Sequence, residues 1–229
     1  MSSITHLGAL CREGRLKEAI QILITTDHLP EDSRTYLQLL QACIAKNALS
    51  EGKMLHSFIS ARGFTFATHT CLQNELISMY AHCGSLVNAR NVFDHMTERD
   101  PTGVQPDQFT FASIVPACAN MGALEQGMDI HQRIIDSGFL SDVVVSNALI
   151  DMYAKCGSIH KAHELFDKMI QRDAFSWTAM IAGYAQNGLL DEAFRLLNTM
   201  LERNSLQDAH KMGFLKGPWR FSSKCNWQV

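Results

Sequence analysis

The sequence predicts an all-α solenoid of about six helix-turn-helix units, or about twelve helices. Three observations predict it. The sequence pattern of residues 76–86 recurs at 149–159, an offset of 73 residues, and that of residues 42–56 recurs at 117–131, an offset of 75. Apolar residues recur at helical spacing within each copy. Glycine turns separate the two helices of most units. Such self-similarity indicates stacked units whose function lies along a repeated surface.

Each unit reads as two short helices joined by a turn. In the unit that begins at residue 143, apolar residues over 149–154 form one helical face. Gly157 ends that helix, Ser158 is a plausible N-cap of the next, and apolar residues continue over 159–169. The same pattern, a glycine turn followed by a helix with apolar residues on one face, occurs at Gly14, Gly84 and Gly188. Two units have longer first helices, over 35–45 and 110–121, with second helices that begin near Leu49 and Leu124.

The internal alignment divides the array into six units. Their boundaries are 1–32, 33–69, 70–100, 108–142, 143–173 and 174–208. Residues 101–107 match the closing turn of a unit whose two helices are missing, which explains the offsets of 73 and 75. Residues 209–229 leave the pattern and combine basic with aromatic side chains. We expect an irregular or disordered tail there, with nucleic-acid contact as the alternative.

Composition excludes several classes of protein. Hydrophobic residues make up 46% of the 229 residues, and charged residues 19%, so the chain is not of a disordered type. The net charge of −3 gives no indication of a polyanionic partner. No apolar run reaches the length of a membrane span, and no signal or transit peptide is visible.

The cysteines are expected to be packing residues. Cys43 and Cys118 occupy equivalent positions, as do Cys83 and Cys156. A residue that recurs in register fills the same packing slot each time, so we expect buried reduced thiols. No Cys-x-x-Cys pair occurs, which makes a zinc ribbon or a redox site improbable.

The repeats resemble those of plant pentatricopeptide repeat (PPR) proteins. Residues 149–158, LIDMYAKCGS, resemble the short repeat, and residues 175–188 resemble the standard repeat. Residues 111–118, with Gly138 and Phe139 downstream, resemble the long repeat. The mixture is typical of the PLS subclass, which is tied to organelle RNA editing, and the resemblance covers about residues 4–208. It implies a right-handed α–α superhelix that binds single-stranded RNA sequence-specifically in mitochondria or chloroplasts, one base per repeat.

The resemblance also implies which residues contact RNA. In the family, an inward residue early in the first helix and the last residue of the repeat choose the base. By position, these pairs are Asn74 with Asp100, Asn147 with Asp173, and Thr178 with Asp208. The first two pairs imply a preference for uracil and the third for guanine. An alternative for each Asn is a structural role, as a cap or a bridge between repeats.

The two long repeats carry apolar residues at the first of these positions. They place Leu37 with Ala67 and Ala112 with Asp142. Leu37 and Ala112 cannot read a base edge by hydrogen bonding. We therefore expect these units to act as spacers or to bind weakly.

Nothing in the sequence indicates catalysis, a cofactor or a metal site. The editing subclass often ends in a zinc-dependent deaminase domain, which needs a His-x-Glu and a Cys-x-x-Cys, and both strings are absent. His160 and His163 lie three apart on one helix, but the equivalent positions in the earlier short repeat are Val87 and Arg90. We expect a non-enzymatic module with no membrane or small-molecule partner. A deaminase-bearing or editing-factor protein could act with it in trans.

Two other interpretations stay open at this point. The chain could be a protein-interaction scaffold, as other helical-hairpin arrays are, and its net charge of −3 slightly favours that reading. It could also be a truncated or degenerate gene product with no independent role. The missing unit after Asp100 and the change of pattern after Asp208 motivate this second alternative.

Overall fold

The computed structural model describes residues 3–26, 33–62, 70–98 and 105–204, and over these residues the chain is all helical. The described residues form twelve α-helices and one 3₁₀ turn, η1, at Phe139–Ser141, and they contain no strand. The predicted all-α fold class is confirmed. The helices are α1 Ser3–Glu13, α2 Leu16–Thr25, α3 Ser33–Lys46, α4 Leu49–Ala61, α5 Thr70–His82, α6 Leu86–Glu98, α7 Gln108–Met121, α8 Leu124–Asp136, α9 Val143–Lys155, α10 Ile159–Lys168, α11 Ala174–Gln186 and α12 Leu190–Asn204.

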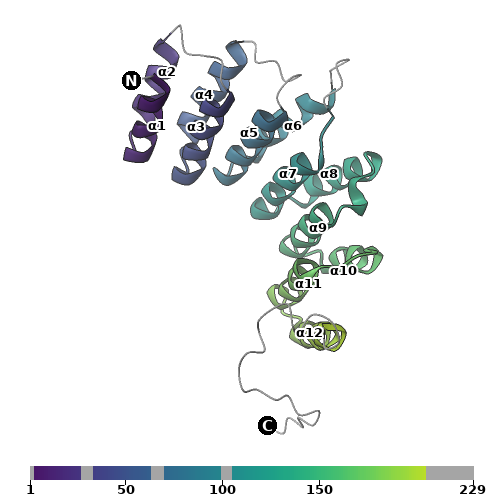
Figure 1. Ribbon diagram of the computed structural model, residues 1–229. Coiled ribbons are helices and arrows are strands. Elements are labelled where there is room, and N and C mark those ends of the chain that lie inside the picture. Colours follow the sequence, from purple (N-terminus) through teal and green to yellow (C-terminus); the bar gives the residue numbers. More distant parts are fainter. Residues whose placement is uncertain (1–2, 27–32, 63–69, 99–104, 205–229) are drawn as a thin grey trace, which may run out of the picture.

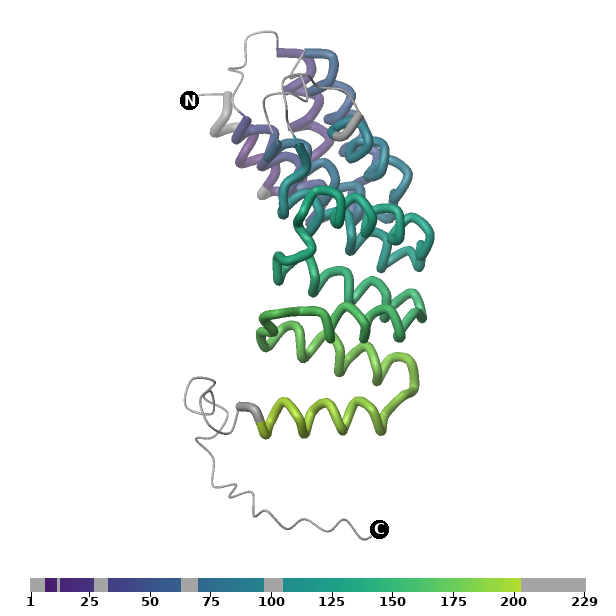
Figure 2. The backbone as a smooth tube through the Cα atoms, turned by 90° about the vertical axis from the view of Figure 1, so that its right-hand side faces the viewer, coloured from purple at the N-terminus to yellow at the C-terminus, as the bar shows by residue number. Residues whose placement is uncertain are grey.

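The helices form hairpins that stack one after another in a curved row, which crosses the top of Figure 1 and then turns downward from α7 on. The odd-numbered helix of each hairpin packs against the odd-numbered helix of the next, and each even-numbered helix lies against its own partner. Figure 2 shows the chain running back and forth through the stack, so the odd-numbered helices all point the same way. The N-terminal turns of α5, α7, α9 and α11 therefore line one edge of the array.

The turn inside a hairpin depends on a left-handed glycine. Gly157 has φ of +75°, which a side chain would strain, and its N–H donates to the carbonyl of Ala154. Ser158 does precede α10, as expected, but its hydroxyl makes no capping hydrogen bond. The expected side-chain cap is therefore wrong. The backbone N–H of Ser158 donates to the carbonyl of Tyr153. Ala48 and Ala123 occupy the same position before α4 and α8.

The core is one continuous cluster of buried side chains that extends from Leu7 to Met180. Cys43 and Cys118 are fully buried in it, and burial raises the pKa of their thiols to about 12 and about 11. Cys83 and Cys156 are half-buried, and burial also raises their pKa values. The packing role predicted for these cysteines is confirmed in full for the first pair and in part for the second.

Helical glycines allow successive units to approach closely. A Cβ atom on Gly127 of α8 would lie 2.6 Å from Sδ of Met152, and one on Gly183 of α11 would lie 2.8 Å from Cβ of Ala154. The equivalent Gly52 of α4 meets Met79 in the same way. The flexible end of a methionine can shift, but Cβ of Ala154 is fixed to the backbone of α9. The tightest constraint is therefore at Gly183.

We expect Gly183→Ala to destabilise the protein by about 1–3 kcal/mol, because the added methyl group overpacks the seam between α9 and α11. This outweighs the roughly 1 kcal/mol that Ala gains over Gly in a helix. The matched control is Gly8→Ala in α1, where nothing lies within 4 Å of the added Cβ. Urea denaturation should show a lower midpoint for the first variant and an unchanged or higher one for the control. Equal shifts in the two variants would contradict the packing argument.

A histidine–tyrosine hydrogen bond recurs between successive units. Nδ1 of His131 in α8 lies 2.8 Å from the Tyr153 hydroxyl of α9, and His56 of α4 makes the same 2.8 Å contact with Tyr80 of α5. His163 and Tyr184 repeat it at 2.9 Å. Burial lowers the pKa of His131 and of His56. Nε2 of His131 is buried and has no hydrogen-bond partner in the described chain, so a proton added there would be unpaired.

We expect stability to fall between pH 7 and pH 5. The folded-state pKa of His131 lies below its unfolded value of about 6.5, so the unfolded chain binds more protons in this range, and stability is lost as pH falls through it. His131→Gln should flatten the plot of thermal midpoint against pH. His82→Gln is the control, because His82 is exposed and its Nδ1 contacts the Ser78 carbonyl of its own helix. A slope unchanged by His131→Gln would contradict this account.

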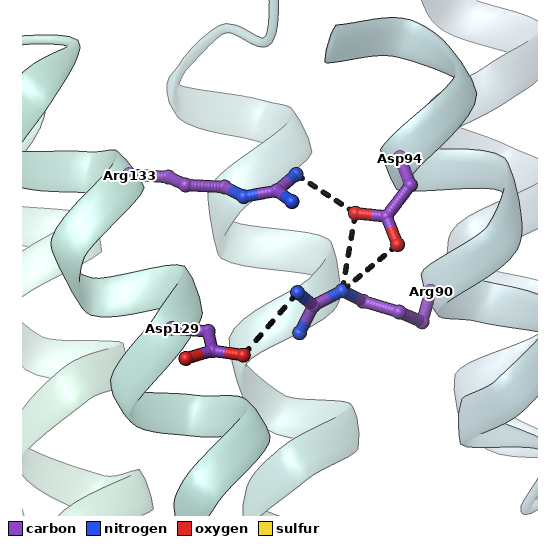
Figure 3. Close-up of polar contacts among 4 residues, drawn as sticks. All are labelled: Arg90, Asp94, Asp129 and Arg133. Atoms are coloured by element: carbon purple, nitrogen blue, oxygen red, sulfur yellow. Dashed lines mark hydrogen bonds and ion pairs between the residues drawn. The ribbon is translucent and has the colours of Figure 1, made fainter. Parts of the chain in front are cut away.

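The units on either side of the position where the sequence predicts a missing unit stack directly on each other. α5 packs on α7 as α9 packs on α11. On the outer side, Nη1 of Arg133 in α8 lies 2.8 Å from Oδ1 of Asp94 in α6, and Arg90 of α6 lies 3.5 Å from Asp129 of α8 (Figure 3). Arg90 also bonds Asp94 at 3.1 Å within α6. Three partly shielded charges, on Arg90, Asp94 and Arg133, and the exposed carboxylate of Asp129 thus join α6 to α8 across the junction.

Candidate functional site

Asn147 and Asp173, predicted as a pair, lie together. Asn147 is on the second turn of α9, and its Nδ2 donates to Oδ1 of Asp173 at 3.1 Å. Asp173 is the N-cap of α11, where the same oxygen accepts from the backbone N–H and the hydroxyl of Ser176 at 2.8 and 2.9 Å. Burial alone would raise the pKa of Asp173, but the hydrogen bonds from Ser176 and Asn147 hold it below its usual range. Asp173 is therefore a fixed carboxylate that orients the amide of Asn147.

The amide of Asn147 keeps hydrogen-bonding capacity. Its Oδ1 is buried and has no hydrogen-bond partner among the described residues. An amide nitrogen carries two hydrogens, of which Asp173 takes one. Oδ1 is buried, so the group that remains for a ligand is the second amide N–H, a donor complementary to a carbonyl oxygen on the Watson–Crick edge of a pyrimidine.

Asn74 makes the equivalent contact, but with a residue that the sequence did not single out. Its Nδ2 donates to Oδ1 of Asp107 at 3.3 Å, and its Oδ1 lies 2.7 Å from the hydroxyl of Thr110. Asp107 is the N-cap of α7. The predicted partner, Asp100, lies outside the described residues, so the pairing of Asn74 with Asp100 stays a prediction.

Thr178 occupies the corresponding position of α11. Its hydroxyl donates to the carbonyl of Ala174 in its own helix at 2.7 Å, which leaves the oxygen lone pairs to accept. The predicted partner, Asp208, lies outside the described residues. The pairing of Thr178 with Asp208 therefore stays a prediction.

The long units carry no polar side chain at this position. Leu37 packs against the core, and Ala112 is half-buried. Asp142 caps α9 by accepting from the N–H groups of Val144 and Val145, but Ala112 offers it no amide. Ala67 lies outside the described residues. The expectation that these units are spacers or weak binders stays a prediction.

Exposed apolar side chains recur beside these polar groups. The second residues of α7, α9 and α11 are Phe109, Val144 and Phe175, with side chains 64%, 61% and 76% exposed, and the second residue of α5 is the exposed Cys71. Each lies three residues before the position of the Asn, Ala or Thr described above, on the same face of the helix. Apolar side chains so exposed and so regularly placed form platforms on which planar ligands can stack.

Sequence reasoning missed these platform residues because apolar positions were assigned to the core. The available signal was an apolar residue directly after the start of successive first helices, outside the buried stripe.

The edge that carries these groups has little positive charge. Among α5, α7, α9 and α11 the single Lys or Arg is Lys155, whose Nζ bonds Asp151 at 2.7 Å. A polyanion held on this edge would be held mainly by stacking and hydrogen bonds.

The described residues show no sign of a metal site or a membrane span. Within them, no group of three or more His, Cys, Asp or Glu side chains is placed to hold a metal ion. No helix in those ranges is long and apolar enough to cross a membrane.

Comparison with known proteins places these repeats in a family. The family model described as PPR repeat matches residues 74–100, 144–173 and 175–205. Among curated proteins, the chain is similar to the pentatricopeptide repeat-containing protein At1g19720 of Arabidopsis thaliana, with 33% identity over 75% of this chain and 22% of that protein. It is also similar to At1g15510, chloroplastic, of the same plant, with 32% identity over 78% of this chain and 25% of that protein. The chain thus spans about a quarter of the length of these relatives.

Solved structures share the fold. The crystal structure of the pentatricopeptide repeat protein PPR10 from maize superposes with a TM-score of 0.71 at 25% identity, over 91% of this chain and 30% of that one. The structure of PPR10 in complex with an 18-nt psaJ RNA element gives a TM-score of 0.67 at 22% identity, over 88% of this chain and 29% of that one. The solenoid architecture predicted from the repeats is confirmed by this likeness.

Proposed function

We propose that this chain, which carries pentatricopeptide repeats, is a sequence-specific module that binds single-stranded RNA and catalyses no reaction itself. The observation that carries the proposal is the pair Asn147–Asp173, in which a fixed carboxylate orients an amide that keeps one N–H donor. The stacking platforms Val144 and Phe175 lie on the same edge. The RNA complex of PPR10, a protein with the same fold, supports the kind of ligand.

In this arrangement one base is read per repeat. A base would stack between the exposed second residues of successive first helices, and its edge would face the residue three positions later. By family resemblance, Asn147 with Asp173 reads uracil, and Thr178 with Asp208 reads guanine. Stacking tolerates any base, because every base has a π face, so the hydrogen-bonding groups supply the discrimination.

The wider role is also a proposal. The mixture of long, short and standard repeats is that of the PLS subclass, so we place the chain in an organelle RNA-processing or RNA-editing factor. Relatives named chloroplastic support a plastid or mitochondrial location. A deaminase-bearing or editing-factor protein would supply chemistry in trans.

We expect the chain to bind oligouridine more tightly than oligoadenosine, and Asn147→Ala to narrow the ratio of the two affinities by about tenfold, because the amide N–H donor is lost. Fluorescence anisotropy with labelled strands measures both affinities. The control is Asn198→Ala, an exposed amide on the second helix α12. Equal affinities for both strands in the parent chain would refute base reading and favour a protein-interaction scaffold.

We expect Phe175→Ala to weaken binding of all strands alike by about 1–3 kcal/mol, because a stacking surface is removed while the reading groups stay. Phe194→Ala is the matched control: this ring is 63% exposed on α12, away from the edge of first-helix N-termini. The same titrations report both variants. A loss of affinity for only one type of strand would argue against a stacking role for Phe175.

A further inference from the structure

We propose that Asp107 is the partner with which Asn74 recognises a base, so that the hairpin 70–98 and the segment 105–107 together form one composite base-reading unit. The inference rests on the proposed RNA-binding function. It assigns a specificity-determining residue that alignment of the repeats does not identify. Alignment pairs Asn74 with Asp100, the last residue of the same repeat.

The first support is the contact itself. Nδ2 of Asn74 donates to Oδ1 of Asp107 at 3.3 Å, and Nδ2 of Asn147 donates to Oδ1 of Asp173 at 3.1 Å. In both cases the Asn is the fifth residue of its helix, and the Asp is the residue directly before the next first helix.

The second support is the local structure around the two carboxylates. Asp107 and Asp173 each form a capping box with the residue three positions on. Those residues, Thr110 and Ser176, both present a hydroxyl to Oδ1 of the Asp, at 2.8 and 2.9 Å. The exposed rings that follow the two caps, Phe109 and Phe175, are likewise equivalent. The start of α7 therefore reproduces the start of α11 group by group.

The third support is the seam between the two units. The hydroxyls of Ser78 in α5 and Ser113 in α7 lie 3.2 Å apart. Between the second helices of the two units, the charges of Arg90, Asp94 and Arg133 join α6 to α8 (Figure 3). This direct stacking holds Asn74 opposite the cap of α7.

The stacking fixes a spacing. Between the Asn74–Asp107 pair and the Asn147–Asp173 pair lies a single unit, 108–142, which carries Ala112 at the reading position. With one base per repeat, the two pairs read bases separated by one nucleotide. Because their geometry is alike, they prefer the same base.

One difference makes the Asn74 pair the more rigid. The hydroxyl of Thr110 lies 2.7 Å from Oδ1 of Asn74, whereas Oδ1 of Asn147 has no partner in the described chain. The single hydrogen of the Thr110 hydroxyl can go to Oδ1 of Asn74 or to Oδ1 of Asp107, so this hydroxyl links the two side chains of the pair.

The test is selection from a pool of single-stranded RNA with randomised sequence, using the parent chain, Asp107→Asn, Asp100→Asn and Asp173→Asn. Asn is as good an N-cap as Asp, so the helices keep their starts. An Asn at 107 can face Asn74 with either its oxygen or its nitrogen, so the amide of Asn74 loses its fixed orientation. Circular dichroism checks that each variant remains helical.

The parent chain should enrich one base at two positions separated by one nucleotide. Asp107→Asn should reduce the enrichment about tenfold at one of the two, and Asp173→Asn at the other. Asp100→Asn should leave the enrichment at both positions unchanged. Enrichment at the position that a variant does not touch is an internal control for folding and for RNA binding.

Two outcomes overturn the inference, and they differ from each other. If Asp100→Asn abolishes one preference while Asp107→Asn leaves both, Asp100 is the partner and the composite unit is wrong. If the parent chain enriches no base at any position, the proposed RNA-binding function itself fails.

A second readout locates the RNA. The exposed thiol of Cys71 lies three residues before Asn74, on the same face of α5. Selected RNA should slow its alkylation by iodoacetamide, measured peptide by peptide by mass spectrometry. Unchanged alkylation of Cys71 at saturating RNA would place the bound strand elsewhere and overturn the inference.

Discussion

Each hairpin of this chain buries its first helix only because the next first helix packs against it. The seam depends on small residues where backbones approach, at Gly127 beside Met152 and Gly183 beside Ala154. Every other feature depends on that seam. It brings His131 to Tyr153, and it places Asn147 of one unit against the cap of the next. A hairpin taken alone would have an open apolar face and an incomplete polar pair, so burial and recognition are assembled by the same contact.

The carboxylates at the seam serve two purposes. Asp173 satisfies N–H groups at the start of α11 and also orients Asn147. Because the helix needs that cap in any state, the carboxylate is in place before a ligand arrives, and little ordering remains to oppose binding. Because of this dual role, replacing a capping Asp by Ala lowers both the stability of the helix and the recognition of the ligand. Replacing it by Asn keeps the cap, so that a change in recognition can be measured by itself.

The fold could be predicted from the sequence because its determinants are local and repeated. Gly157 in a left-handed turn, the apolar stripes and the paired Cys43 and Cys118 all recur in register. The hydroxyl cap expected at Ser158 was wrong because the backbone N–H of Lys161, which such a cap could bind, donates to the backbone carbonyl of Ser158. The platform residue Phe175 escaped notice because an exposed and a buried apolar side chain look alike in a sequence.

The contact made by Asn74 shows why alignment of the repeats can fail to predict which side chains meet between units. Alignment assigns residues to a unit by their order in the chain, but a reading pair forms across the seam between two units. Where units follow one another without interruption, as at Asn147 and Asp173, the two descriptions coincide. Between Asn74 and Asp107, where the repeat alignment predicts a missing unit, the two descriptions differ, and the residue that caps the next helix makes the contact. A reading pair is therefore better defined by the helix that its carboxylate caps than by the repeat in which that carboxylate is counted.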